Sequence, residues 1–295
     1  LNRGRVSQVL GTRIQICTFE EEYLGEFGRG KGTADDQFKV PVSMAFNSED
    51  LLYLTDEVLN EIKVFDVDGS FVDRWGSTGI DSEGLVGPSG IAIDSEDNIY
   101  VVEQYGNRVR KFTSDGKPIL KWGEEGEREG QFDIPWGVAL DSENNVYVAD
   151  WRNDRVQKFT SDGEFMASFG ESGEGEGQFK RPSSVAVDDD GLIYIADWGN
   201  QRLQVFDSHG KFLYMNRGEA DLNPWALEYF ESQQDEQRAR SSYVPIYETD
   251  TDDIREISAR IEPYFWDPCS VMVDGSGRVY VLETCRHRFQ MFDRV

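Results

Sequence analysis

Residues Pro135 to Arg181 read PWGVALDSENNVYVADWRNDRVQKFTSDGEFMASFGESGEGEGQFKR, and most of the chain is a variant of this stretch. Its opening proline recurs at Pro41, Pro88, Pro182 and Pro268, and the first three steps between these prolines are each 47 residues. A fixed period of about 20 to 50 residues is typical of solenoids, propellers and arrays. The chain is therefore expected to be built from repeated units.

Each unit contains four short runs that have the composition of β-strands. In the quoted unit these are Gly137–Leu140, Asn145–Ala149, Arg155–Phe159 and Glu164–Phe169, which are rich in β-branched and aromatic residues and bounded by turn residues. The Asp162-Gly163 pair between the last two runs suits a tight hairpin with positive φ. Four antiparallel strands per unit, repeated along the chain, predict an all-β fold of the β-propeller type.

An acidic residue ends the second strand of each unit, and in four units an arginine follows five residues later. We expect each pair to face across a hairpin as a structural clamp, because arginine can bind a carboxylate through two hydrogen bonds. The alternative is a ring of catalytic or metal-binding carboxylates. The second unit lacks the pair, since Asp56 is followed by Glu61. The predicted pairs are Glu103–Arg108, Asp150–Arg155, Asp197–Arg202 and Glu283–Arg288.

The quoted unit resembles the NHL repeat. The resemblance rests on Tyr147-Val-Ala-Asp150, Asn153-Asp-Arg-Val-Gln-Lys-Phe159 and Asp162-Gly-Glu-Phe165, and it covers the chain except for the segment after Gly218. NHL domains are usually six-bladed propellers that bind partners on one face, and the family includes RNA-binding domains, protein-interaction domains and a few enzymes. The resemblance therefore implies the fold and leaves the function open.

The repeat spacing predicts one domain, 1–295, with six blades. Arg3 to Thr12 is expected to be a loop between strands two and three of a truncated first blade, with the missing strands upstream of Leu1. Five blades is the alternative, if the N-terminal fragment only completes the last blade. The expected blades are 1–40, 41–87, 88–134, 135–181, 182–218 and 268–295.

The period breaks once, between Pro182 and Pro268, and the surplus lies in residues 219–267. Asn223-Pro224 predicts the start of one helix. A second helix is expected near Thr251, because Ile254, Ile257 and Ile261 form an apolar stripe. This helical insertion is either a packing element or a lid or docking element over the binding face.

The chain of 295 residues is strongly acidic, with 56 Asp and Glu against 30 Lys and Arg and a net charge of −26. This charge argues against nucleic-acid partners and against an anionic membrane surface. It is compatible with a basic protein partner, a cationic ligand or calcium. No apolar run is long enough to span a bilayer.

The loops between strands two and three and the connections between blades are expected on one face, which the resemblance implies is the binding face. Exposed Trp, Tyr and Arg are common at binding hot spots, although each Trp could instead pack against the next blade. Cys269, Cys285 and His287 fall near this face, but their spacing matches no zinc motif. The predicted binding residues are Gln104, Tyr105, Trp136, Trp151, Arg152, Trp198, Arg286 and His287.

These features favour a non-enzymatic scaffold that binds a protein, peptide or glycan through an aromatic and acidic face. The alternative is a metal-dependent propeller enzyme, either a lactonase or esterase with calcium or a lyase with zinc. Such lyases use several histidines around zinc, whereas this chain has His209 and His287 alone. The first strands, such as Gly137-Val-Ala-Leu140, would line the channel with apolar residues.

Overall fold

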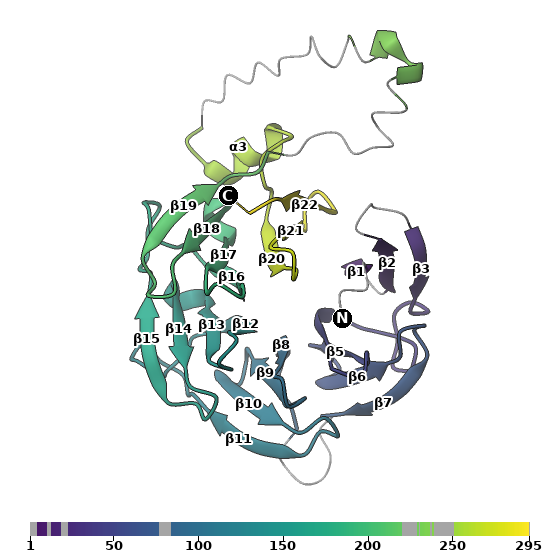
Figure 1. Cartoon of the computed structure of the whole chain (residues 1–295), viewed down its shortest axis with the longest axis vertical. Coiled ribbons are helices and arrows are strands. Elements are labelled where there is room, and N and C mark those ends of the chain that lie inside the picture. Colours follow the sequence, from purple (N-terminus) through teal and green to yellow (C-terminus); the bar gives the residue numbers. More distant parts are fainter. Residues whose placement is uncertain are drawn as a thin grey trace.

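A computed structural model describes residues 5–10, 13–18, 23–76, 84–219, 229, 231–236, 238 and 251–294. The described strands form six antiparallel sheets that follow one another around a ring (Figure 1). Four of these sheets have four strands, and the first and last sheets have three. The strands are, by sheet, β1 (Arg5–Leu10), β2 (Arg13–Thr18), β3 (Tyr23–Phe27); β4 (Pro41–Phe46), β5 (Leu52–Asp56), β6 (Glu61–Phe65), β7 (Phe71–Trp75); β8 (Pro88–Ile93), β9 (Ile99–Glu103), β10 (Arg108–Phe112), β11 (Pro118–Trp122); β12 (Pro135–Leu140), β13 (Val146–Asp150), β14 (Arg155–Phe159), β15 (Phe165–Phe169); β16 (Pro182–Val187), β17 (Ile193–Asp197), β18 (Arg202–Phe206), β19 (Phe212–Asn216); and β20 (Pro268–Val273), β21 (Val279–Glu283), β22 (Arg288–Phe292).

The inner strands β8, β12, β16 and β20 lie toward the centre of the ring (Figure 1), and β4 lies next to β8. Each of these five strands begins at a proline. Proline suits this position because the first residue of a strand need not donate to the ladder. Neighbouring inner strands approach closely: the Ser89 hydroxyl donates to the Trp136 carbonyl at 2.9 Å, and the Ser183 hydroxyl donates to the Pro268 carbonyl at 3.1 Å. The inner strands are thus joined across the boundaries between blades.

The core lies between adjacent sheets rather than inside one sheet. The outer strand of one blade ends in an aromatic side chain that packs on the next blade, as Trp75 does on Phe112 and Trp122 on Phe159, with ring centroids 4.9 and 5.9 Å apart. The glycine of the next blade's Asp-Gly turn lies under this ring: Gly116 has φ +79°, and a Cβ there would clash with Trp75. The turn thus needs glycine both for its backbone conformation and for the packing.

The structure supports five blades and does not support the predicted six. Five sheets contain an inner strand that begins at a proline, whereas the sheet β1–β2–β3 has no described strand of that kind. The N-terminal sheet packs against the blade β4–β7 through Ile14 and Phe27, whose ring lies 5.0 Å from that of Phe65. It is also not paired with β20–β22 in the described part of the chain, so the two remain separate three-stranded sheets.

One local expectation also changed. The stretch predicted as a loop, 3–12, contains β1, which pairs with β2 in a register that places Val6 opposite Cys17 and Val9 opposite Ile14. In the segment 219–267, α3 (Ile254–Arg260) begins after Asp253, whose carboxylate accepts a hydrogen bond from the Arg255 backbone N–H. The helix expected after Pro224 lies largely outside the described residues.

We predict that Gly137→Ala lowers the free energy of unfolding by about 2 kcal/mol, a typical cost of overpacking. A Cβ at this position would lie 2.7 Å from Ser184 Cα and 2.8 Å from the Ser183 carbonyl oxygen of the next inner strand. Gly25→Ala is the control, because nothing lies within 4 Å of its Cβ position. Urea unfolding measures both variants, and equal stability would contradict the close packing of inner strands.

Candidate ligand-binding face

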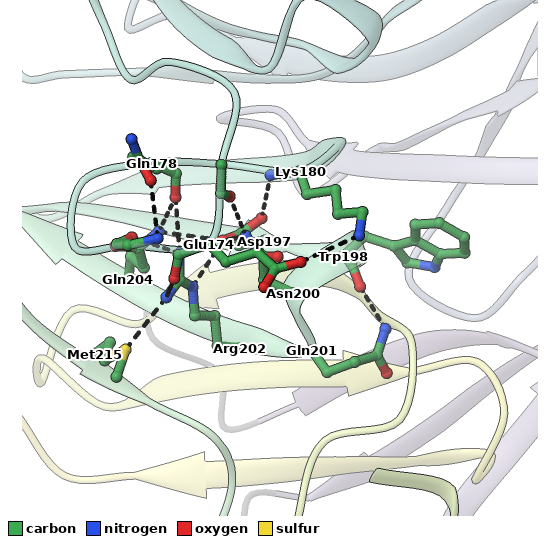
Figure 2. Close-up of polar contacts among 12 residues, drawn as sticks. Glu174, Gln178, Lys180, Asp197, Trp198, Asn200, Gln201, Arg202, Gln204 and Met215 are labelled. Atoms are coloured by element: carbon green, nitrogen blue, oxygen red, sulfur yellow. Dashed lines mark hydrogen bonds and ion pairs between the residues drawn. The ribbon is translucent and has the colours of Figure 1, made fainter. Parts of the chain in front are cut away.

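One face of the ring is formed by the loops between the second and third strands of each blade and by the connections between blades; we call it the loop face. A buried carboxylate holds each loop in place. In the blade β16–β19, Asp197 accepts hydrogen bonds from the Lys180 backbone N–H at 2.8 Å and from the side chains of Asn200, Arg202 and Gln204 at 2.9, 2.8 and 3.1 Å (Figure 2). The acid therefore joins two loops and one strand.

The arginine of this clamp continues the network into the connection from the preceding blade. The Arg202 guanidinium donates to the carbonyls of Glu174, Gly175 and Gln178 at 2.8 to 2.9 Å (Figure 2). Gln204 donates to the same Gln178 carbonyl at 2.7 Å. The connection 170–181 is thus fixed through its backbone.

The same pairing is present in the other three blades where it was predicted. Arg155 Nε lies 2.9 Å from Asp150, Arg288 Nε lies 2.8 Å from Glu283, and Arg108 forms an ion pair with Glu103. These acids have 0 to 1 % exposure. Burial raises the pKa values of Asp150 and Asp197 above the usual range, although the surrounding donors oppose this effect.

The blade β4–β7 uses a different arrangement. Asp56 accepts backbone hydrogen bonds from Lys39 and Val40 at 2.6 and 3.2 Å. The buried Lys63 lies 3.5 Å from Glu61 and donates to the carbonyls of Ala34 and Gln37 at 2.6 and 2.5 Å. A lysine two residues along the strand thus takes over the loop contacts that arginine makes elsewhere.

A second repeated contact joins neighbouring blades. In four blades the last residue of the loop between strands two and three has a left-handed backbone and accepts a hydrogen bond from the residue before the next blade's proline. Asn107 accepts from the Ile134 N–H at 2.8 Å, and Asp154 accepts from the Arg181 N–H at 2.6 Å. His287, with φ +52°, occupies this position in the last blade and is exposed.

Three of the predicted tryptophans form a row across two blades of the loop face. Trp136 packs edge-on against Trp151 with ring centroids 5.8 Å apart, and Trp151 packs at a tilt against Trp198 at 6.3 Å. All three side chains are half-buried. The Arg181 guanidinium lies over the Trp151 ring, 4.8 Å from its centroid. We call Trp136, Trp151 and Trp198 the tryptophan row.

The other predicted face residues differ in their accessibility. Tyr105 is 59 % exposed, and its hydroxyl donates to Glu57 at 2.7 Å, whereas Gln104 is buried. Arg152 is exposed and lies 3.7 Å from Asp133. Arg286 donates to the carbonyls of Ser258, Ala259 and Ile261 at 2.8, 3.4 and 3.0 Å. Arg286 is therefore engaged with the C-terminal end of α3.

Helix α3 lies beside one end of the tryptophan row. Arg255 donates to both oxygens of Asp267 at 2.8 and 2.6 Å, and its guanidinium is 6.0 Å from the Trp198 ring centroid. Cys285 also donates to Asp267, at 3.1 Å. Burial tends to raise the pKa of Asp267, but the hydrogen bonds from Arg255, Cys285 and Gln201 hold it below the usual 3.8. Arg255 and Asp267 were not predicted as face residues.

A polar hollow of about 490 Å³ adjoins the tryptophan row between the blades β12–β15 and β16–β19. We call it the seam hollow. Sequence reasoning missed it because its residues come from three separate loops. Arg152 is the one predicted residue in its lining, which consists of Asp133, Arg152, Asp154, Ser172, Lys180 and Arg181.

Within the described ranges, no group of three or more His, Cys, Asp or Glu side chains is arranged to hold a metal ion. Cys269 donates to the Leu282 carbonyl at 3.5 Å, while Cys285 contacts Asp267. Both cysteines are free thiols. None of the helices in the described part of the chain is long and apolar enough to cross a membrane.

Comparison with known proteins agrees with this architecture: the chain is a β-propeller. The family model for the NHL repeat matches residues 132–159 and 179–206, and together with the blade arrangement these matches support an NHL-repeat propeller. No curated protein matches the chain in a sequence comparison.

Several solved structures share the fold at low sequence identity. A gluconolactonase from Xanthomonas campestris is 15 % identical with a TM-score of 0.61, over 95 % of this chain and 78 % of its own. A streptogramin B lyase is 13 % identical with a TM-score of 0.59, and the match covers 100 % of this chain and 81 % of the lyase. A virginiamycin B lyase from Staphylococcus aureus, solved with quinupristin, is 14 % identical with a TM-score of 0.58, and the match covers 99 % of this chain and 82 % of the lyase. At such identities the likeness shows the fold alone.

We predict that Asp197→Asn destabilises the protein by about 3 kcal/mol, because it removes one partner of a buried ion pair. The amide NH₂ would face donors on either side, since Oδ1 accepts from Lys180 and Oδ2 from Asn200, Arg202 and Gln204. Chemical unfolding measures the effect. The exposed pair Asp115–Lys117 provides the control, and Asp115→Asn should leave stability unchanged.

We also predict that Asp267→Asn loosens α3. A carboxyl whose folded pKa is lowered stabilises the fold above its usual pKa and loses that contribution as the pH falls through the lowered value. The substitution mimics the protonated form at neutral pH. The Ile257 and Ile261 amides donate to the Asp253 and Ile257 carbonyls of α3 at 2.9 and 3.1 Å. Hydrogen exchange at these amides should become about tenfold faster, which corresponds to a loss of about 1.4 kcal/mol in the free energy of opening the helix. Unchanged exchange would show that Arg255 does not hold the helix; Asp293→Asn, at an exposed pair with Arg278, is the control.

Proposed function

We propose that this NHL-repeat propeller is a non-enzymatic scaffold that binds a protein, peptide or glycan through the loop face. The observation that carries the proposal is the tryptophan row, in which three half-buried indoles lie in sequence across two blades. Tryptophan dominates binding hot spots because a large rigid ring is desolvated at little cost in side-chain entropy. The row therefore offers a preorganised contact surface.

The rigidity of the loops supports this proposal. We call the buried carboxylates that end the second strands the clamp acids. Trp151 and Trp198 lie in short 3₁₀ turns and directly follow two of them, Asp150 and Asp197. Because each acid fixes both its own loop and the adjoining connection, the indoles are held before a partner arrives. A preorganised surface loses less conformational entropy on binding.

The position of the clamp acids bears on the enzyme alternative. The five carboxylates that end the second strands are buried, and each accepts backbone hydrogen bonds, side-chain hydrogen bonds or both. Their lone pairs are thus engaged in holding loops. A metal-dependent lactonase, esterase or lyase would have to draw its ligands or bases from other residues.

The position of α3 supports a role for this helix at the tryptophan row. Through Arg255 the helix borders Trp198, and through Asp267 it is tied to the last blade. We propose that α3 bounds the tryptophan row at one end and shapes what can bind there. The segment 219–267 is then a docking element rather than a packing element alone.

The proposal predicts that Trp151→Ala with Trp198→Ala weakens ligand capture by more than about tenfold, as loss of hot-spot residues does. The full chain is screened against a displayed library of random 12-residue peptides and an immobilised glycan panel. Met166→Ala with Leu213→Ala is the matched control, since these side chains lie exposed on outer strands of the same two blades. Unaltered capture by the tryptophan variant would contradict the proposed face.

A parallel measurement separates the scaffold from the enzyme. Thermal unfolding is followed with a chelator and then with added calcium or zinc, together with turnover of glucono-lactone. A ligand at about 100 times its Kd adds about 2.7 kcal/mol of stability. The scaffold predicts no such gain and no turnover; a rise in Tm with metal-dependent turnover would favour the enzyme.

A further inference from the structure

The seam hollow concentrates positive charge on a strongly acidic protein. Three cations, Arg152, Lys180 and Arg181, line it together with Ser172 and two aspartates. The chain as a whole carries a net charge of −26. A cavity next to the tryptophan row with more cations than acids in its lining therefore differs in charge from the chain as a whole.

The repeat supplies an internal comparison, because equivalent positions lie 47 residues apart. At the preceding seam, between β8–β11 and β12–β15, no lining position holds a cation. The positions of the three cations Arg152, Lys180 and Arg181 are taken there by Tyr105, Asp133 and Ile134. Since both seams are built on the same clamps, the cations are not required by the fold.

The two aspartates of the hollow are already engaged. Asp154 accepts from the Ser172 hydroxyl at 2.7 Å and from the Arg181 backbone N–H at 2.6 Å. Asp133 lies 3.7 Å from Arg152. The bond from Arg181 to Asp154 joins two neighbouring blades, as the bond from the Ile134 N–H to Asn107 does at the preceding seam. Lys180 is likewise paired, with Glu174 at 3.5 Å, so Arg181 is the cation of the hollow that no carboxylate of the described residues pairs.

Arg181 is held in a position suited to binding. Its backbone is left-handed, with φ +57°, which costs a non-glycine residue roughly 1 kcal/mol. Its guanidinium rests on the Trp151 ring at 4.8 Å, and among the described residues it has no hydrogen-bonded acceptor. Several N–H donors thus face the hollow in a fixed orientation. A planar guanidinium of this kind matches a carboxylate, which accepts two parallel hydrogen bonds.

The neighbouring part of the loop face indicates what the carboxylate belongs to. Tyr105, Val58 and Val86 are 59, 50 and 41 % exposed. Tyr105 and Val86 occupy the preceding seam at the positions of Arg152 and Asp133. Valine side chains offer nothing to sugar hydroxyls but pack well against apolar side chains. The surface therefore suits a polypeptide better than a glycan.

We propose that the loop face binds an apolar peptide segment that carries a carboxylate, and that the seam hollow receives this carboxylate. The inference rests on the proposed scaffold function and specifies its partner. The apolar residues of the segment cover the tryptophan row and the seam at Tyr105, while Arg152 and Arg181 donate to the carboxylate. A single acid in an otherwise uncharged segment limits repulsion from the acidic surface, because exposed charges beyond about 10 Å are largely screened by salt.

The test is selection of displayed random 12-residue peptides on the full chain, followed by titration of one selected peptide. Enriched peptides should carry Asp, Glu or a free C-terminal carboxylate beside apolar residues. Arg152→Gln with Arg181→Gln should weaken binding of the synthetic peptide by about tenfold or more. Lys121→Gln with Lys211→Gln removes the same charge from exposed outer-blade positions and should leave binding unchanged. Synthetic versions with Glu→Gln or an amidated C-terminus identify the carboxylate.

The other outcomes are distinct from one another. Peptides that require Trp151 but lack an acid, and that bind the arginine variant equally well, would overturn the carboxylate inference and leave the scaffold. Failure to select any peptide that depends on Trp151, with arginine-dependent binding of a uronate oligosaccharide, would overturn the peptide partner and leave a glycan scaffold. No binding that depends on either the tryptophan row or the arginines would overturn both proposals.

Discussion

The buried carboxylate at the end of each second strand is the interaction on which the rest of this structure depends. It accepts a hydrogen bond from the backbone of the connection that leads in from the preceding blade. In most blades it also accepts hydrogen bonds from an arginine and from a second side chain of the third strand. Burying such a charge without partners is costly, so the loops have few alternatives to the observed conformation. The carboxylates therefore define the loop face although they are themselves buried.

The periodic sequence is sufficient to predict most of the local structure, because strands, Asp-Gly turns and acid–arginine pairs five residues apart are all determined within one hairpin. The number of blades could not be predicted in this way. It depends on how the described residues before Pro41 pack against distant sheets, and β1 formed where a loop was expected. The seam hollow was also not predictable residue by residue, since Asp133 and Arg181 lie in different connections. Comparing positions one period apart would have identified the cation at Arg181 as a departure from the repeat, since Val40, Gly87 and Ile134 occupy its position in the other units.

The opposite face of the ring shows how many of the acidic residues are structural. In the turn between β12 and β13, Asp141 accepts from the Asn145 side chain and backbone and lies 3.1 Å from both the Tyr147 hydroxyl and Lys158. Burial tends to raise the pKa of Asp141, but these partners hold it below its usual value. Asp94 has the same partners in the previous blade. The net charge of the chain thus says less about its ligand than the few cations do.

The residue before each inner-strand proline has a left-handed backbone at four seams, where it is Gly87, Ile134, Arg181 and Asp267. These are a glycine and three chemically different side chains on one backbone geometry, and in each case the backbone N–H of this residue donates to a side chain of the preceding blade. The structure thereby separates stability from recognition. The contact between blades uses the backbone N–H of the residue before the proline, so the side chain of that residue is free to vary. A propeller of this kind can acquire a new specificity one seam at a time, through exchange of a single residue whose neighbours need not change.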